Sequence, residues 1–216
     1  MQDESLMNFL EEATSLYQKG LEVSPEGVAY LASRGLSEEA VRTARLGYVS
    51  DPLPDHMHFA GMISMPYLSP NGVTALKFRR INGGNGPKYM APLGQAVRMY
   101  NVLALSTRTD TIAVCEGEFD ALIAHQMCGI GAVGISGVSN WKAHYPRMLK
   151  GFTNVLVVTD NDAKDDGSNP GQDLAARVLA DIPRARNVLL PSGMDLNEFY
   201  LAEGADAVRD RLGVLA

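Results

Sequence analysis

Apolar residues in the first fifty positions recur at intervals of three and four, which is the spacing of amphipathic helices. One such run occupies residues 6–17, and its apolar side chains fall on a single helical face. Ser24 stands directly before Pro25, the order of an N-cap followed by the first helical residue, and Ser37 precedes a third periodic run. The chain is therefore predicted to open with three helices.

The pattern changes to that of extended strands after residue 60. The segments GMISMPYL and VTALKFRRI flank SPNG, and Asn-Gly is a frequent dipeptide of tight hairpin turns. A glycine-rich segment, NGGNGPKYM, follows the second strand and is predicted to form a loop. In our interpretation, the three helices and this hairpin make up a small mixed helical and β domain.

From residue 111 onward, strands and helices alternate. The apolar runs TIAVC, GAVGI, NVLVV and NVLL are separated by segments of helical periodicity. Strands that are apolar throughout are buried on both faces, which requires a mainly parallel sheet with helices on each side. We therefore predict an α/β fold, α+β overall, with a helical and β-hairpin domain over residues 1–108 and a parallel-sheet domain over residues 109–216.

The composition is that of a globular protein, with 46% hydrophobic and 20% charged residues and no apolar run long enough to cross a membrane. The start of the chain is acidic and amphipathic, whereas a secretory leader is basic and then apolar. Cys115 and Cys128 lack the spacing of a zinc site, and His56 and His58 are expected in a solvated loop. We expect a cytoplasmic protein with no membrane partner.

Charge is distributed unevenly along the chain, although the formal net charge is −6. The 54 residues between Asp55 and Asp110 contain no Asp or Glu, and they carry six basic residues: Lys77, Arg79, Arg80, Lys88, Arg98 and Arg108. A polyanion-binding surface next to an acidic site would explain this asymmetry. A chance cluster on a solvated face is the alternative.

Acidic residues follow three of the four predicted strands. Glu116 comes after the first strand, Asp160 and Asp162 after the third, and Asp195 shortly after the fourth, while Asp120 lies one helical turn beyond Glu116. The carboxyl ends of parallel strands share one rim of the sheet, so these carboxylates are expected to converge. Crowded carboxylates repel one another unless cations neutralise them, and oxygen ligands suit Mg²⁺ or Mn²⁺. We predict a divalent-metal site, and for Asp120 and Asp195 a helix-capping or first-turn role is the alternative.

Two segments resemble the Toprim domain, which is shared by DnaG-type primases, type IA and II topoisomerases and small nucleases. VCEGEFDALIAHQMCGI contains Glu-Gly after a strand, and VLVVTDNDAKDDGSNPGQDLAA contains Asp-x-Asp after a later strand. YLASRGLSEEAVRTARLGYV, ISMPYLSPNGVTALKFRRI and GPKYMAP further resemble the helical entry, strand pair and PKY segment of DnaG-type primase catalytic cores. The resemblance covers residues 28–200 and points to a phage or plasmid type of core.

The sequence departs from the family pattern at several positions. The family's DGDxAG reads DNDAKDDGSNPGQD here, which places a longer loop before the helix. Asn197 stands where primases often have a second Asp after the position of Asp195, and Arg79 occupies the position of a Gly. We expect no zinc-binding module before this core and no helicase-binding domain after it.

The resemblance implies a DNA primase that synthesises short RNA primers on single-stranded DNA by two-metal nucleotidyl transfer, with Mg²⁺ or Mn²⁺. It makes Asp160 and Asp162 the main metal ligands, with Asp195 helping and Asp120 pointing to the same place. Glu116 would act as general base or as an additional ligand, and the sequence leaves both roles open.

The resemblance also assigns a task to the basic segment. Four basic residues would hold the template backbone and the nucleoside triphosphates: Lys77, Arg79, Arg80 and Lys88. Tyr89 would stack on a base, or alternatively pack its loop against the core. The resemblance implies single-stranded DNA and nucleoside triphosphates as partners. It also implies a protein partner, either a helicase or a separate zinc-binding subunit.

Two other functions use the same acidic residues. A Toprim nuclease would hydrolyse phosphodiesters, but the N-terminal segments and the PKY segment do not support it. A non-catalytic Toprim protein that binds nucleic acid or a replication partner is favoured by Asn197, by the long acidic loop and by the expected lack of a zinc module.

Overall fold

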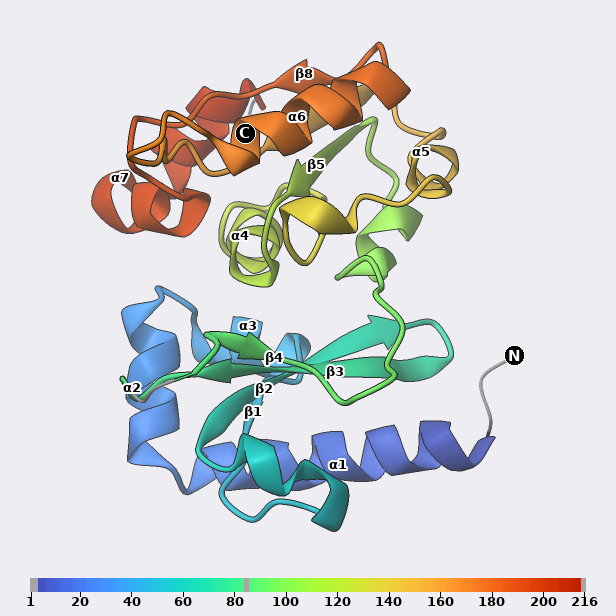
Figure 1. Ribbon diagram of the computed structural model, residues 1–216, viewed down its shortest axis with the longest axis vertical. Coiled ribbons are helices and arrows are strands. Elements are labelled where there is room, and N and C mark those ends of the chain that lie inside the picture. The colour runs from blue at the N-terminus through green and yellow to red at the C-terminus, as the bar shows by residue number, and fades with distance from the viewer. Residues whose placement is uncertain (1–3, 84–85, 215–216) are drawn as a thin grey trace. The chain divides into compact units, whose positions relative to one another are not determined.

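The computed structural model of the protein describes residues 4–83 and 86–214, and the chain divides into two compact units, Met1–Ala96 and Val97–Ala216 (Figure 1). Residues 84–85 of the predicted loop lie outside the described residues. The division falls before the boundary predicted near residue 108, because the connecting segment packs with the second unit. Met99 and Ala104 belong to the apolar core of that unit, and Tyr100 forms a β-bridge with Gly134.

Three helices open the first unit, as the periodicity predicts. Ser24 Oγ accepts a hydrogen bond from Gly27 N at 3.1 Å, and Ser37 Oγ accepts one from Ala40 N at 3.1 Å. Both serines therefore cap the helices that follow them. The helices are α1 (Glu4–Glu22), α2 (Pro25–Ser33) and α3 (Glu38–Thr43).

An antiparallel sheet of four strands follows, in the order β1-β2-β3-β4. Its two long strands form the predicted hairpin, with Ser69 paired to Gly72 at the turn. Gly72 has a φ of +105°, a conformation that favours glycine, and this explains why the turn ends in Asn-Gly. The strands are β1 (Gly47–Tyr48), β2 (Met62–Ser69), β3 (Gly72–Arg80) and β4 (Tyr89–Met90).

Helix α1 packs against this sheet and supplies one side of the apolar core (Figure 1). Leu10, Ala13 and Tyr17 lie on its buried face at the three-and-four spacing seen in the sequence. Leu76 and Phe78 of β3 belong to the same cluster and are fully buried. The apolar face of α1 thus packs against the hairpin of β2 and β3.

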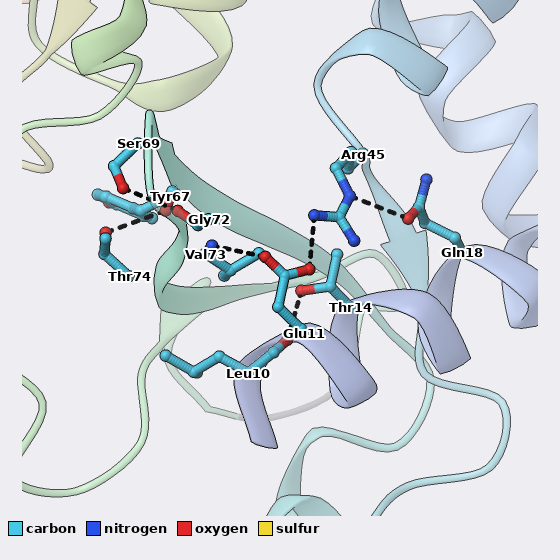
Figure 2. Close-up of polar contacts among 10 residues, drawn as sticks. All are labelled: Leu10, Glu11, Thr14, Gln18, Arg45, Tyr67, Ser69, Gly72, Val73 and Thr74. Atoms are coloured by element: carbon cyan, nitrogen blue, oxygen red, sulfur yellow. Dashed lines mark hydrogen bonds and ion pairs between the residues drawn. The ribbon is translucent and has the colours of Figure 1, made fainter. Parts of the chain in front are cut away.

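The Glu11 side chain connects α1 to β3 and to the segment after α3 through hydrogen bonds at the edge of this core (Figure 2). Its Oε1 accepts a hydrogen bond from Val73 N in β3 at 2.8 Å. Its Oε2 accepts one from Arg45 Nη1, also at 2.8 Å, and Arg45 Nε donates to Gln18 Oε1 at 3.3 Å. The carboxylate is therefore satisfied by a main-chain donor and by a guanidinium.

His56 also belongs to the core, so the prediction of a solvated loop is wrong for this residue. It lies in a short 3₁₀ helix, Pro54–Phe59, is 1% exposed, and its Nδ1 is 2.7 Å from the Tyr17 hydroxyl. A 3₁₀ helix aligns residues three apart, so His56 and Phe59 turn inward together, next to Phe78. His58 faces outward and is exposed, as predicted.

As predicted, a parallel sheet forms the centre of the second unit, and its four strands lie in the order β6-β5-β7-β8. The two central strands are buried almost throughout, which agrees with their continuous apolar character. The last strand is shorter than the predicted NVLL run. The strands are β5 (Thr111–Cys115), β6 (Ala132–Gly134), β7 (Asn154–Val158) and β8 (Arg186–Asn187).

Helices cover both faces of this sheet. Two of them share an apolar core with β5 and β7, in which Val114 and Val157 meet Leu174 and Val178. The general rule that crossovers between parallel strands are right-handed assigns the helix between β5 and β6 to the opposite face. The C-terminal helix packs against that helix. The helices are α4 (Glu118–Leu122), continued by a π-helical turn (Ile123–Met127), α5 (Tyr145–Met148), α6 (Pro170–Asp181) and α7 (Leu196–Leu212).

Two of these helices differ in length from their predictions. The run WKAHYPRMLKG is helical only over α5, whereas α7 extends well beyond LNEFYLAEG. Gly204, the last residue of LNEFYLAEG, has a φ of +84° and a ψ of 177°, which is not helical, so α7 consists of two helices that meet at a kink there. The second of them buries Val208 and Leu212. None of the helices that the structure describes combines the length and the apolar character needed to cross a lipid bilayer.

Candidate metal and nucleic-acid sites

The carboxyl ends of β5 and β7 lie side by side at one rim of the parallel sheet. Cys115 pairs with Val158, so the chain leaves both strands at the same level. Glu116 follows β5, Asp160 follows β7, and the Asp160 main-chain N–H donates to Glu116 Oε2 at 3.4 Å. The chain continues to α4 on one face and to α6 on the other, which makes this the switch point where open α/β sheets bind ligands.

Two glycines allow the backbone to approach this rim closely. A Cβ atom at Gly171 would lie 2.3 Å from the Asp160 carbonyl oxygen and 3.0 Å from Glu116 Oε2. A Cβ atom at Gly134 would lie 2.8 Å from the Gly117 carbonyl oxygen. Because no side chain obstructs it, α6 begins directly beside both acids, where its N-terminal dipole favours negative charge.

Glu116 and Asp160 are held in an environment that opposes their ionisation. Burial raises the pKa of Glu116 to about 7, with contributions from the charges of Asp120, Asp162 and Asp195, although the hydrogen bond from Asp160 N lowers it. Burial and the charges of Glu116, Asp195 and Asp162 likewise raise the pKa of Asp160 to about 7. Burial is thus the largest cause for both acids, and the charges that add to it belong to other carboxylates, so positive charge would relieve this repulsion.

The other three predicted ligands act on Glu116 through their charges, and each lies in a different setting. Asp120, in the first turn of α4, is buried, and its Oδ1 accepts a hydrogen bond from Asn197 N at 3.2 Å. Asp195 caps α7, and its Oδ1 accepts a hydrogen bond from Glu198 N at 2.6 Å. Asp162 is exposed on the loop after β7. The first-turn and capping roles weighed for Asp120 and Asp195 are thus both present.

This donor set fits a divalent cation by its chemistry. It offers carboxylate oxygens from three separate connections of one sheet, which are the ligands that Mg²⁺ and Mn²⁺ prefer. Within residues 4–83 and 86–214, however, no three Asp, Glu, His or Cys side chains gather around one point closely enough to hold an ion. The coordination of a metal by these residues stays a prediction.

Amide side chains that the sequence patterns did not reveal hold the rim together. Gln172 Nε2 donates to Asp160 O at 3.4 Å, and Gln172 Oε1 accepts from Asn187 Nδ2 at 2.8 Å. Asn161 Nδ2 donates to Leu190 O at 2.7 Å. The position of Asn161 between two aspartates was a visible signal, but nothing in the sequence indicates its partner.

In the first unit, β3 and β4 bring three of the predicted nucleic-acid residues together. Tyr89 pairs with Arg79 across the strands, the Arg79 Nη1 donates to the Tyr89 hydroxyl, and Lys77 Nζ lies 4.5 Å from the centre of the Tyr89 ring. Arg79 Nε also donates to the Tyr30 hydroxyl of α2, and Arg79 is only 6% exposed. Tyr89 therefore packs against its neighbours, whereas stacking on a base stays a prediction.

Arg80 and Lys88 complete the predicted basic set. Lys88 is exposed, and its carbonyl oxygen accepts a hydrogen bond from Arg80 N at 3.0 Å. The Arg80 Nη2 lies 3.8 Å from Met90 Sδ. Arg98 and Arg108 of the same acid-free segment fall in the second unit, so this continuous stretch of basic sequence is divided between the two units.

Known proteins match both the parallel-sheet unit and the chain as a whole. The Toprim domain family matches residues 111–206. A DNA primase of Myxococcus xanthus is 26% identical in an alignment 220 positions long, which spans 83% of this chain and 36% of that protein. Gene 57 protein of Mycobacterium phage D29 is 35% identical over 159 residues, which cover 71% of this chain and 99% of that protein. The chain belongs to the DnaG-type primase catalytic cores with a Toprim domain.

Solved DnaG-type primases share the fold. The zinc-binding and RNA polymerase domains of Aquifex aeolicus primase match with a TM-score of 0.80 at 19% identity, over 98% of this chain and 61% of that one. A DnaG primase catalytic domain bound to single-stranded DNA matches with a TM-score of 0.76 at 20% identity, over 97% and 81% of the two chains. The predicted fold class and the family resemblance are confirmed.

Proposed function

We propose that the chain is a primase core that synthesises short RNA primers on single-stranded DNA by metal-dependent nucleotidyl transfer. The observation that carries the proposal is the meeting of Glu116 and Asp160 at the switch point of the parallel sheet, where the charges of Asp162 and Asp195 act on both of them. Membership of the DnaG-type family supports this class of reaction. The DnaG catalytic domain bound to single-stranded DNA supports this class of template.

Asp160 and Asp162 are the main candidates for metal ligands, with Asp195 and Asp120 beside them. Two bound Mg²⁺ or Mn²⁺ ions would activate the attacking 3′-hydroxyl and stabilise the charge that builds up on the α-phosphate. The buried strands β5 and β7 fix the main chain that carries the acids. Glu116, hydrogen-bonded to the Asp160 main chain, serves as general base or as a further ligand.

We assign the phosphate contacts of the template and of the nucleoside triphosphates to the basic residues of the first unit. Lys88 is exposed, and Lys77 and Arg80 are partly exposed, so their charges are available to phosphates. Arg79 contributes differently, since its guanidinium donates to Tyr30 and Tyr89. It orients the Tyr89 ring, which offers an aromatic surface to a base.

Two kinds of partner accompany this activity in our proposal. The Aquifex primase contains a zinc-binding domain in addition to its RNA polymerase domain, and a separate zinc-binding subunit would supply the same module here. A helicase would present the single-stranded template. We place the reaction in the cytoplasm, together with its template and nucleoside triphosphates.

A template-directed assay with single-stranded DNA, labelled ribonucleotides and Mg²⁺ or Mn²⁺ tests the proposal. The unaltered chain should make short labelled products, and Asp160→Asn and Asp162→Asn should each reduce synthesis by more than about 100-fold, the upper end of what removing an outer-shell partner costs. Asp210→Asn is the matched control, because Asp210 is exposed near the end of α7. It should retain full synthesis.

Other results would favour the competing functions. Degradation of the DNA, abolished by the same two substitutions, would indicate a Toprim nuclease. Binding of the DNA with neither synthesis nor degradation would indicate a non-catalytic Toprim protein. Primer synthesis that survives both substitutions would overturn the assignment of the metal ligands.

A further inference from the structure

Asn161 lies between the two aspartates of the Asp-x-Asp segment, and both ends of its side chain are engaged. Its Nδ2 donates to Leu190 O at 2.7 Å, and its Oδ1 accepts a hydrogen bond from Asn169 Nδ2 at 3.3 Å. Leu190 belongs to the connection between β8 and α7, whereas Asn169 is the N-cap of α6. One amide thus joins the loop after β7 to two other segments.

The main chain of Asn161 adds two links to the connection before α7. Asn161 N donates to Met194 O at 3.3 Å, and Gly193 N donates to Asn161 O at 2.8 Å. Met194 immediately precedes Asp195. The hydrogen bonds of Asn161 therefore hold the segment of the two neighbouring aspartates against the segment that ends in Asp195.

The loop beyond Asp162 has few other anchors among its described hydrogen bonds. Lys164 N donates to Ser168 O, and Gly167 N donates to Lys164 O, both at 2.8 Å, so these bonds lie within the loop. This loop is longer than the family's DGDxAG wording, in which a glycine stands at the position of Asn161. A glycine has no side chain to make either amide bond, so the longer loop coincides with an added anchor.

We propose that Asn161 is a positioning residue for divalent-cation binding, which keeps the aspartates of two separate connections in register. The inference rests on the proposed function, since these aspartates must share cations for their register to matter. The strand β7 is buried by its apolar residues, so loss of the amide would loosen the loop while the sheet stays intact. The effect should therefore appear in cation binding before it appears in folding.

Titration calorimetry with Mn²⁺ alone, without DNA or nucleotides, tests this role. Asn161→Gly should weaken Mn²⁺ binding by about ten-fold, the lower end of the effect of removing an outer-shell partner. Asn101→Gly is the matched control, because Asn101 Nδ2 also donates to a main-chain oxygen at 2.7 Å, that of Ala132 at the start of β6. It has the same chemical change away from both acidic connections and should bind Mn²⁺ like the unaltered chain.

The primer assay provides a second measurement. The Mn²⁺ concentration that gives half-maximal synthesis should rise by the same factor in Asn161→Gly, while the rate at saturating Mn²⁺ is largely kept. A residue with a purely structural role would lower the rate without shifting the Mn²⁺ dependence.

Several outcomes decide the inference. Equal Mn²⁺ affinity of Asn161→Gly and the unaltered chain would overturn it, and so would an equal loss in Asn101→Gly. If Asn161→Gly does not fold, Asn161→Ser takes its place, because the shorter side chain cannot span both partners, and the same loss is expected. An unaltered chain that binds no Mn²⁺ would overturn the proposed function together with the inference.

Discussion

Two glutamates show how differently the two units of this molecule treat charge. Glu11 in the first unit accepts hydrogen bonds from Val73 N and Arg45 Nη1, both at 2.8 Å. Burial opposes its ionisation, but these partners outweigh burial and lower the pKa of Glu11 below its ordinary value. Glu116 in the second unit also accepts a main-chain hydrogen bond, yet burial and neighbouring carboxylates raise its pKa to about 7.

We interpret the difference as one between charge that supports the fold and charge that a bound ligand would neutralise. An acid with a basic partner stabilises the folded state when it is ionised. Acids that raise one another's pKa weaken the folded state when they are ionised, and such groups are typical of functional sites. The carboxylate of Glu11 is thus matched by donors within the first unit, whereas the charges that raise the pKa values of Glu116 and Asp160 all belong to carboxylates.

The largest expected effect is stabilisation of the second unit, which carries the proposed ligands, by a divalent cation. At a Mn²⁺ concentration 100-fold above its Kd, the free energy of unfolding should rise by about 2.7 kcal/mol. Thermal unfolding at pH 8, above the raised pKa values of Glu116 and Asp160, measures this gain.

Asp160→Asn should lose most of this gain, because it removes a proposed ligand. Without metal it should unfold at a higher temperature than the unaltered chain, because one charge leaves the crowded rim. Asp210→Asn should keep the gain. If metal-free Asp160→Asn is less stable than the unaltered chain, the charge of Asp160 does not weaken the fold, and the proposed difference between the two units is wrong.

A smaller effect is expected at the completed charge of the first unit. Glu11→Ala should lower the free energy of unfolding by about 1–2 kcal/mol, because it removes two hydrogen bonds and leaves their donors unmatched. The value is modest because 40% of the Glu11 side chain and 29% of the Arg45 side chain are exposed. Urea unfolding provides the measurement.

The ion pair between Asp206 and Arg209 on α7 is the matched control for Glu11. Asp206 is 91% exposed, so Asp206→Ala should change the free energy of unfolding by less than about 0.5 kcal/mol. Equal losses in Glu11→Ala and Asp206→Ala would mean that Glu11 contributes no more than a surface charge.

The smallest effect concerns the pH dependence of the first unit. Burial lowers the pKa of His56 more than the charge of Asp55 raises it, so the folded state favours the neutral ring. The unfolded ring titrates near pH 6.5, so this stability is present above about pH 6.5 and is lost as the pH falls through the lower folded value. The urea midpoint should therefore fall as the pH is lowered from 7 to 5.

His56→Gln should reduce this dependence, since glutamine does not titrate and still offers a hydrogen-bonding group to the Tyr17 hydroxyl. His58→Gln should leave the dependence unchanged, because His58 is exposed. Parallel pH profiles of His56→Gln and the unaltered chain would show that the buried ring has no effect on stability.

Most helices and strands could be predicted from short stretches of the sequence. Ser24 and Ser37 cap their helices, and Asn-Gly closes the hairpin, because capping and turn geometry depend on residues within three or four positions. The continuous apolar runs identified a buried parallel sheet. The same local reasoning was wrong for His56, which is buried through contacts with α1 and β3 far away along the chain.

By itself, the sequence determined which residue types follow which strands, and hence that acidic groups would share one rim. Only the tertiary structure decided how those groups are held. The close approach that Gly171 permits, the bridge made by Asn161 and the burial of Arg79 between two tyrosines all join segments that lie apart in the chain. Propensity and periodicity act over a few residues, whereas burial, pKa and side-chain bridges depend on neighbours that folding brings together.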